Sequence, residues 1–256
     1  MKVTVEKQFT SLPARPLPER RVVDRLLAAL DQIAENSPRI ISRSLGQFES
    51  AGRNYSLPRY VYLGPKSGGD VIRIGIFATI HGDEPEGALA LTRFVAELEK
   101  NPEIAKGYAL YIYPVCNPTG FEDNTRHARG GKDLNREFWR QSAEPEVRFL
   151  ESEITLHALN GIITLHSDDT SNGLYGFASG AVLSEHLLEP ALLAAEQFLP
   201  RNRERVIDGF DAQRGIITDG YRGVLQALPG INSPPFEITF DNVRVPRENL
   251  LNKYAD

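Results

Sequence analysis

Residues 71–84 read Val-Ile-Arg-Ile-Gly-Ile-Phe-Ala-Thr-Ile-His-Gly-Asp-Glu, a long apolar run that ends in polar residues. The residues up to Ile80 are almost all apolar, which predicts a strand buried within a sheet that helices cover. This strand delivers His81 and Glu84 into a loop that contains Gly82. An imidazole and a carboxylate are two of the three protein ligands that a catalytic zinc needs, so a third ligand is expected elsewhere in the chain.

The third candidate ligand is His166, at the end of a second apolar stretch. Residues 161–168 read Gly-Ile-Ile-Thr-Leu-His-Ser-Asp and again predict a strand that ends at a histidine. Ligands of α/β sheets tend to lie beyond the carboxyl ends of the strands, where His81 and His166 both fall. We therefore expect His81, Glu84 and His166 to form one zinc site. Two histidines and a carboxylate leave a coordination position open for water or substrate, as catalytic sites do.

The remaining hydrophobic patterns predict strands that alternate with helices. Helices are expected at residues 20–35, 85–100, 144–159 and 190–199, and strands at residues 60–63, 71–80, 108–115, 162–166 and 236–240. Residues 64–69, rich in glycine, predict a hairpin-type loop between the first two strands. The alternation predicts a single α/β domain with a mixed, mostly parallel twisted sheet and helices on both faces.

The first part of the chain is punctuated by Pro13, Pro16 and Pro18, which predict an extended N-terminal arm over residues 1–20. Residues 21–256 are then expected to form the catalytic domain. The hydrophobic fraction of 41% and the charged fraction of 25% are typical of a globular protein. The formal net charge is −5 and no basic run is present, so no nucleic acid partner is expected.

Cysteine content and hydropathy predict the cellular compartment. The single cysteine, Cys116, excludes an intrachain disulfide and fits a reducing environment. The first residues lack the apolar stretch of a signal peptide, and no apolar segment is long enough to span a bilayer. We therefore expect a cytoplasmic protein without a membrane partner. The sequence makes no prediction about the oligomeric state.

Three arginines, Arg126, Arg129 and Arg136, lie within the polar residues 117–138 that follow the third predicted strand. Such a segment can be a solvated loop. It can also be an anion site, because arginine forks bind a carboxylate in bidentate fashion and stabilise an oxyanion as it develops.

Together these motifs resemble the zinc metallocarboxypeptidase superfamily, and in particular its short bacterial-type branch. That branch includes the succinylglutamate desuccinylases and the aspartoacylase-like deacylases. The matching motifs are, in order, His81-x-x-Glu84, Asn117-Pro118-x-Gly120, Arg126-x-x-Arg129, Asp133-x-Asn135-Arg136 and the strand-borne His166. The combination is specific, whereas no single motif is.

The resemblance implies roles for the residues of the arginine-rich segment. Arg129 would stabilise the oxyanion of the tetrahedral intermediate. Asn135 and Arg136 would bind the substrate carboxylate, with Arg126 as a further substrate-binding residue. Asp133 is expected to orient the loop rather than to touch the substrate. The zinc ligands implied by the resemblance are the three residues already named.

The resemblance also implies a general base on a late strand, which activates water and then protonates the leaving amine. Glu237 and Asp241 are the two candidates, and strand alternation places both on one face. We expect Glu237, since aspartate is one methylene shorter, with Asp241 as the alternative. Tyr221, which is flanked by glycines, is a candidate for the mobile tyrosine that closes over the substrate. An ordinary surface-loop tyrosine is the other interpretation.

The leading hypothesis from the sequence is a hydrolase with one Zn²⁺ per chain that cleaves an amide bond next to a free carboxylate. The reaction would be of the carboxypeptidase type, with a small peptide as substrate. The first alternative is an N-acyl amino acid deacylase of the succinylglutamate desuccinylase/aspartoacylase type, with an N-acyl amino acid as substrate. The second is a catalytically silent zinc- or carboxylate-binding protein, which the unsettled choice between Glu237 and Asp241 leaves open.

Overall fold

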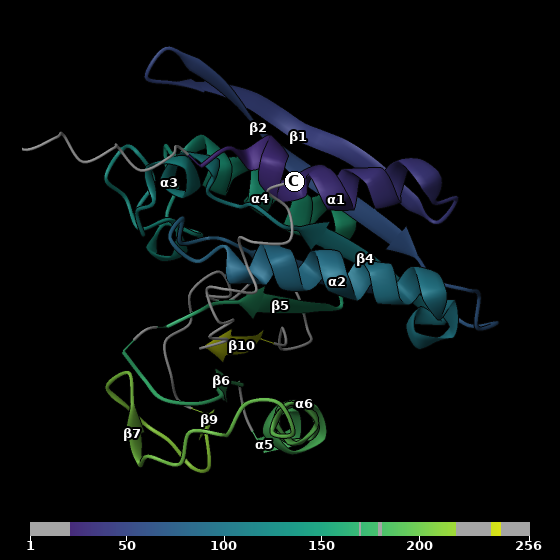
Figure 1. The fold of residues 1–256 in the computed structure, drawn as a ribbon, viewed down its shortest axis with the longest axis vertical. Helices are drawn as coiled ribbons and strands as arrows, with labels where there is room; N and C mark the ends of the chain where they lie inside the picture. The colour runs from purple at the N-terminus through teal and green to yellow at the C-terminus, as the bar shows by residue number, and fades with distance from the viewer. Residues whose placement is uncertain (1–20, 169, 179–180, 219–236, 242–256) are drawn as a thin grey trace, which may run out of the picture.

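The computed structural model describes residues 21–168, 170–178, 181–218 and 237–241, so the expected arm over residues 1–20 and Tyr221 lie outside it. The helices are α1 (Val23–Asn36), α2 (Glu86–Lys100), α3 (Pro118–Asp123), α4 (Pro145–His157), α5 (Ala181–Leu183) and α6 (Glu189–Ala195). Short 3₁₀ turns occur at Pro102–Ala105 and Leu134–Arg136, and a π-helical turn, Ser184–Leu188, joins α5 to α6. Figure 1 shows these elements in place.

The main sheet has the strand order β1-β2-β4-β3-β5-β10-β6-β9, and β7 and β8 form a separate pair. The strands are β1 (Ile40–Ser50), β2 (Arg53–Leu63), β3 (Ile72–Ala78), β4 (Tyr108–Tyr113), β5 (Gly161–Leu165), β6 (Tyr175–Phe177), β7 (Val206–Ile207), β8 (Phe210–Asp211), β9 (Ile216–Ile217) and β10 (Glu237–Asp241). The central strands β4, β3, β5 and β10 run parallel to one another, and β6 runs parallel to β9. The pairs β1–β2, β2–β4 and β10–β6 are antiparallel. The expected mixed, mostly parallel α/β sheet is therefore confirmed.

The loop at residues 64–69 does not form the expected hairpin. Strand β4 lies between β2 and β3, and Leu110 of β4 pairs with Tyr62 on one side and with Ile74 on the other. Strand β2 pairs instead with β1, which the sequence did not predict. The hairpin prediction was wrong because glycine-rich residues mark a turn without specifying which strands become neighbours.

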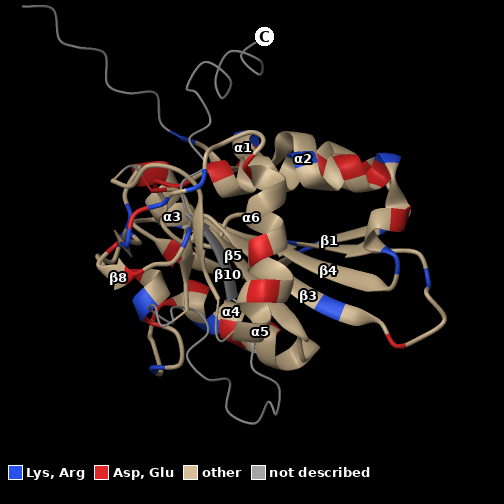
Figure 2. Ribbon diagram, turned by 90° about the horizontal axis from the view of Figure 1, so that it is seen from below, with Lys and Arg blue, Asp and Glu red and all other residues tan. Residues whose placement is uncertain are grey.

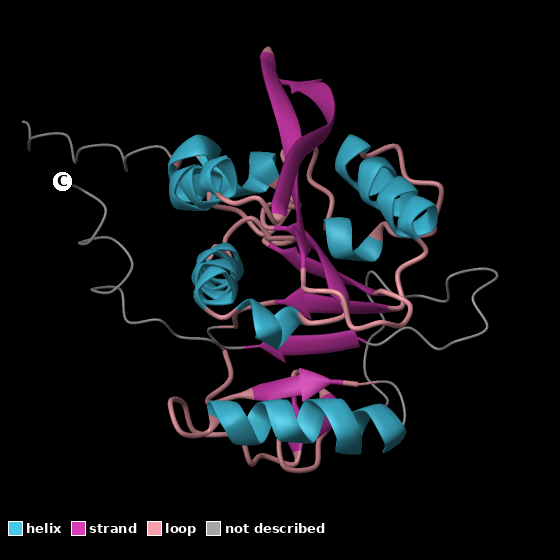
Figure 3. Ribbon diagram, turned by 90° about the vertical axis from the view of Figure 1, so that its right-hand side faces the viewer, coloured by secondary structure: helices cyan, strands magenta, loops and turns pink. Residues whose placement is uncertain are grey.

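Alternate side chains of β3 enter two different cores. Ile76 packs in a cluster with Leu30 of α1 and Leu91 of α2, whereas Phe77 packs in another with Leu150 of α4. Side chains of a strand alternate between its two faces, so a strand apolar on both faces requires cover on both. Figure 3 shows the sheet edge-on with helices on both sides, as expected from the sequence.

The neighbouring positions of β3 and β5 determine where the candidate ligands lie. The two strands are parallel, and Ala78 at the end of β3 pairs with Leu165 at the end of β5. His166 follows Leu165 directly, and His81 lies shortly after Ala78. The segments that carry the two histidines therefore leave the sheet at the same edge and side by side.

Acidic and basic residues are interspersed along the ribbon (Figure 2). Among the described residues, no helix has both the length and the apolar character that crossing a bilayer requires.

Candidate metal centre

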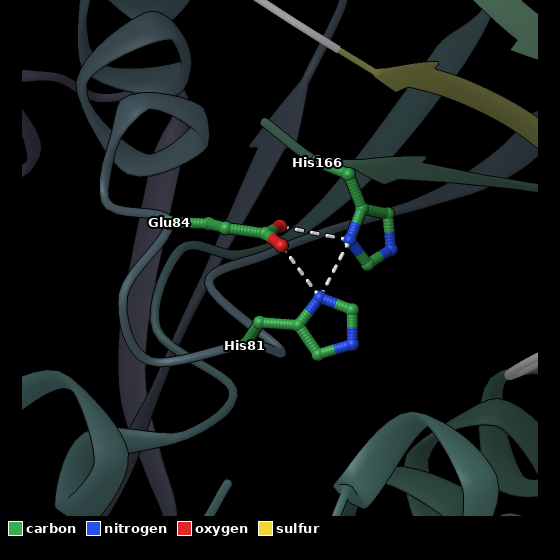
Figure 4. Close-up of side chains that lie close together, drawn as sticks. All are labelled: His81, Glu84 and His166. Atoms are coloured by element: carbon green, nitrogen blue, oxygen red, sulfur yellow. Dashed lines mark hydrogen bonds and ion pairs between the residues drawn. The ribbon is translucent and has the colours of Figure 1, made fainter. Parts of the chain in front are cut away.

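His81, Glu84 and His166 converge beyond the carboxyl ends of β3 and β5 (Figure 4). The Nδ1 atom of His81 lies 2.7 Å from Oε1 of Glu84, and the Nδ1 atom of His166 lies 2.9 Å from Oε2. The two Nδ1 atoms are 3.1 Å apart. The sequence placed these three residues together, and the structure brings them together.

The spacing of these atoms fits a small cation. Zinc bonds of 2.0–2.2 Å at tetrahedral angles place ligand atoms about 3.3–3.6 Å apart, so a small outward shift from the separations of 2.7–3.1 Å would admit the ion. Both histidines are buried, and the exposed fraction of Glu84 is 9%. Two imidazole nitrogens and a carboxylate, directed at one another in a buried position, form a donor set suited to zinc.

Glu84 is held in its ionised form. Burial acts to raise the pKa of this carboxyl, but hydrogen bonds with His166 and His81 outweigh the burial and lower the pKa to about 2. The backbone N–H of Ser167 also donates to Oε2 of Glu84, at 3.2 Å. The carboxylate is therefore available to a cation at neutral pH, because a metal ligand must be deprotonated.

Asp133 supports the centre from the other side of the His81 ring. Its Oδ1 atom lies 3.5 Å from Nε2 of His81 and accepts a hydrogen bond from the backbone N–H of Asn135 at 3.1 Å. Burial acts to raise the pKa of Asp133, but the proximity of His81 and Arg126 lowers it well below its usual range. Asp133 thus bonds within its own loop and lies close to a candidate ligand, a contact that the sequence analysis did not propose.

Arg126 lies beside the group, and Arg136 lies near Asp133. The Nε atom of Arg126 donates to Oδ2 of Asp133 at 3.2 Å, and its guanidinium lies 3.8 Å from Oε1 of Glu84. The Nε atom of Arg136 is 4.0 Å from the same Asp133 oxygen, and Asn135 is buried next to it. Both guanidiniums are nearly half exposed, so they can reach a ligand in solvent.

Arg129, the arginine expected to stabilise the oxyanion, faces a different part of the loop. Its guanidinium forms a bidentate pair with Asp123 at 2.6 and 2.7 Å and donates to the hydroxyl of Tyr55 at 2.6 Å. It also lies 3.8 Å from Glu122. None of the contacts of Arg129 within the described chain involves a candidate zinc ligand, because the acidic end of α3 binds this guanidinium.

The two candidate bases occupy different ends of β10. Glu237 pairs with Ile162, four residues before His166, whereas Phe240 pairs with Leu165. Asp241 follows Phe240 and is therefore level with His166, while Glu237 lies about 13 Å away along the strand. The backbone register thus places Asp241, rather than Glu237, level with His166.

Similarity to known proteins identifies the family of the chain. A family model described as the succinylglutamate desuccinylase/aspartoacylase catalytic domain matches residues 70–201, just over half of the chain. This range includes all three candidate ligands and the arginine-rich loop. A search among curated proteins finds no match.

Solved structures share the fold at low sequence identity. A candidate metallopeptidase from Shewanella baltica OS155 has 21% identity over 86% of this chain and 83% of its own, with a TM-score of 0.69. The metallo-carboxypeptidase from Burkholderia cenocepacia has 18% identity over 87% and 60%, with a TM-score of 0.59. The metallo-carboxypeptidase from Pseudomonas aeruginosa, bound to (2-guanidinoethylmercapto)succinic acid, has 19% identity over 87% and 60%, with a TM-score of 0.56.

The chain thus shares its fold with metallo-carboxypeptidases. It belongs to the succinylglutamate desuccinylase/aspartoacylase catalytic domain family.

Proposed function

We propose that this protein is a zinc-dependent hydrolase that cleaves an amide bond next to a free carboxylate. The observation that carries the proposal is the convergence of His81, Glu84 and His166 beside two half-exposed arginines. Zinc held by these three residues would lower the pKa of water toward ~7 and polarise the scissile carbonyl. A cation next to a carboxylate-binding surface suits a substrate that carries one carboxylate beside the bond to be cut.

Side chains of the arginine-rich loop would stabilise the oxyanion and bind the substrate carboxylate. The guanidinium of Arg126, near Glu84, would neutralise the oxygen that becomes negative as the carbonyl is attacked. Asn135 and Arg136 would bind the substrate carboxylate and so fix the amide in place. We transfer the oxyanion role from Arg129 to Arg126, because the contacts of Arg129 with Asp123 direct it elsewhere.

A carboxylate of β10 would take a proton from the attacking water and return it to the leaving amine. The register of β10 supports Asp241 in this role, since it lies level with His166. Glu237 remains the second candidate on chemical grounds. Replacing each by its amide, Glu237→Gln and Asp241→Asn, tests the assignment, and the variant of the true base loses kcat by a factor of ~10²–10⁴.

Two reactions use this apparatus. The carboxypeptidase reaction, on small peptides, is supported by the fold shared with metallo-carboxypeptidases. Deacylation of N-acyl amino acids is supported by the family to which the chain belongs. The ligand of the Pseudomonas aeruginosa structure is a succinic acid derivative, which supports recognition of a small carboxylate in either case. The single cysteine supports a reducing, cytoplasmic setting.

The proposal is tested with purified protein that has never been exposed to a chelator. We expect one zinc per chain, and hydrolysis in one of two panels, C-terminally varied dipeptides or N-acyl amino acids. His81→Ala should remove both metal and activity, whereas His186→Ala, an exposed histidine on the π-helical turn, should keep both. Absence of metal from the wild-type protein, with activity unaffected by His81→Ala, would contradict the proposal. Zinc binding without hydrolysis in either panel would favour the silent binding protein.

A further inference from the structure

The side chain of Asn117 is fully buried and makes hydrogen bonds with both of its amide atoms. Its Oδ1 atom accepts from the backbone N–H of Gly120 at 2.8 Å, which caps the start of α3. Its Nδ2 atom donates to two carbonyls, that of Ile80 at 3.2 Å and that of Arg126 at 3.3 Å. Ile80 directly precedes His81 in the chain. One amide group therefore joins the segment of a candidate ligand to the segment of the arginine beside it.

The backbone of Thr79 makes this contact possible. Thr79 has a φ of +52°, a left-handed conformation that is unusual for a β-branched residue. Successive carbonyls of a strand point alternately to opposite neighbours. Here, however, the carbonyls of Ala78 and Thr79 accept from the N–H groups of Cys116 and Asn117 at 3.1 and 3.0 Å. With the carbonyl of Ile80, three successive carbonyls are bound by the same neighbouring segment.

Such a conformation persists only when its surroundings hold it in place. The hydrogen bonds from the N–H groups of residues 116 and 117 stabilise the left-handed backbone at Thr79, whose side chain is fully buried. A further bond links the same two segments, since the N–H of Gly82 donates to the carbonyl of Arg126 at 3.3 Å. The carbonyl of Arg126 is thus bound by Gly82 and by Asn117. The ligand loop and the arginine loop are fixed to each other through backbone atoms.

We propose that Asn117 is a positioning residue, which holds His81 and Arg126 in one arrangement through the carbonyls of Ile80 and Arg126. We call this set of two hydrogen bonds the Asn117 clamp, and the left-handed backbone of Thr79 allows it to form. The proposal rests on the proposed function, because it takes His81 as a zinc ligand and Arg126 as the group that faces the substrate. Asn117 acts through the backbone and takes no part in the chemistry itself.

The variant Asn117→Asp separates the clamp from the helix cap. The carboxylate keeps the acceptor for Gly120, and aspartate is as good a cap as asparagine. It loses both donors and places an oxygen against two carbonyl oxygens. We expect the Kd for zinc, measured by chelator competition, to rise at least ~10-fold, the size of effect seen when groups behind a metal ligand are altered. We also expect kcat to fall by a larger factor than KM rises, because Arg126 is displaced.

Asn202→Asp is the matched control. Asn202 is also buried, its Oδ1 atom accepts from the backbone N–H of Glu204 at 2.9 Å, and its Nδ2 atom has no hydrogen-bond partner within the described chain. The same chemical change there breaks no donor contact, so the Kd for zinc and both kinetic constants should stay within twofold of wild type. If Asn117→Asp does not fold, Asn117→Ser keeps a capping oxygen and replaces the two amide N–H donors by one O–H on a shorter side chain, so it should show the same effects.

The outcomes separate this inference from the proposed function. Wild-type affinity for zinc and wild-type kcat in folded Asn117→Asp or Asn117→Ser would overturn the clamp. If wild-type protein binds no zinc, the proposed function fails, and crystal structures of wild type and variant still test the clamp. Displacement of His81 and Arg126 in the variant supports the clamp, and unchanged positions of both overturn it.

Discussion

The Nε2 atom of His81 lies 3.5 Å from Oδ1 of Asp133, while the Nδ1 atom of the same ring faces Glu84. A carboxylate at one imidazole nitrogen fixes the orientation of the ring and raises the basicity of the other nitrogen. Asp133 also interacts with Arg126, so a single carboxylate couples a candidate ligand to a candidate catalytic cation. The first prediction follows from this coupling.

Asp133→Asn should weaken zinc binding ~10–100-fold, because the amide lacks the charge that orients and polarises His81. The hydrogen bond from the backbone N–H of Asn135 survives in this variant, since the amide oxygen at residue 133 can still accept it. Competition with a chromogenic chelator measures the affinity. Asp211→Asn, which alters an exposed carboxylate on β8, serves as the control. Wild-type affinity in Asp133→Asn would show that His81 needs no such support.

Arg126→Lys should lower kcat ~10²–10³-fold, the usual effect of removing a group that stabilises an oxyanion. The guanidinium of Arg126 is nearly half exposed, so Tm should change little. Arg129→Lys should do the opposite, lowering Tm with a smaller effect on kcat, because lysine cannot reproduce the fork to Asp123 and the contact with Tyr55. Kinetic measurements and thermal melts of both variants show which arginine stabilises the oxyanion and which stabilises the fold. The reverse pattern would return the oxyanion role to Arg129.

Gly82→Ala should destabilise the protein by at least ~2 kcal/mol and weaken zinc binding, since overpacking forces the backbone to shift. A Cβ atom at Gly82 would lie 2.0 Å from the carbonyl carbon of Gly120, so the loop next to His81 must move. Gly69→Ala is the control, because a Cβ atom there meets nothing within 4 Å. Urea unfolding and chelator competition measure the two effects. Equal stability of the two variants would contradict the close packing of the Gly82 loop on α3.

Glu146 should make the stability of the protein depend on pH. Burial raises the pKa of this carboxyl in α4, the charge of Glu144 adds to the rise, and a hydrogen bond with Thr119 opposes it, which leaves the pKa at about 7. The folded chain therefore holds the proton more tightly than the unfolded chain. The resulting stability is complete below the usual value of 4.5 and is lost as pH rises through 7.

Glu146→Gln stays neutral, so its stability relative to wild type should grow between pH 5 and pH 8, by ~1–3 kcal/mol in total. Urea unfolding of both proteins across this range gives the difference. Glu185→Gln, at an exposed glutamate, should follow wild type at every pH. Parallel curves for Glu146→Gln and wild type would show that Glu146 ionises normally in the folded protein.

The sequence predicted those elements whose residues carry a strong local pattern. The apolar run before His81 and the stripe through Leu91 and Val95 identified β3 and α2 within one or two residues, because both elements bury a continuous apolar surface. Strand β1 was missed since most of its side chains are exposed and it lies at the edge of the sheet. The insertion of β4 between β2 and β3 depends on contacts between distant segments, which no local pattern encodes.

Some features of the candidate site could likewise be predicted from the sequence, and others could not. His81, Glu84 and His166 were predictable because strand ends carry ligands and the residue types suit zinc. The contacts of Arg129 were not predictable, because they depend on which guanidinium Asp123 binds. The tight turn at Thr79 was equally hidden, since threonine gives no sign of a left-handed backbone. The pair Asn117-Pro118 did carry a signal, that of a helix start, but not that of a link between two loops.

The parallel pairing of β3 with β5 also bears on the order of events during folding. His81 and Glu84 lie on one short segment, whereas His166 reaches them only after β5 has docked beside β3. A partly folded chain can thus offer two ligands, and the third arrives with the sheet. If the site binds zinc as proposed, tight binding would report that β3 and β5 are paired, and the bound ion would stabilise the chain against unfolding.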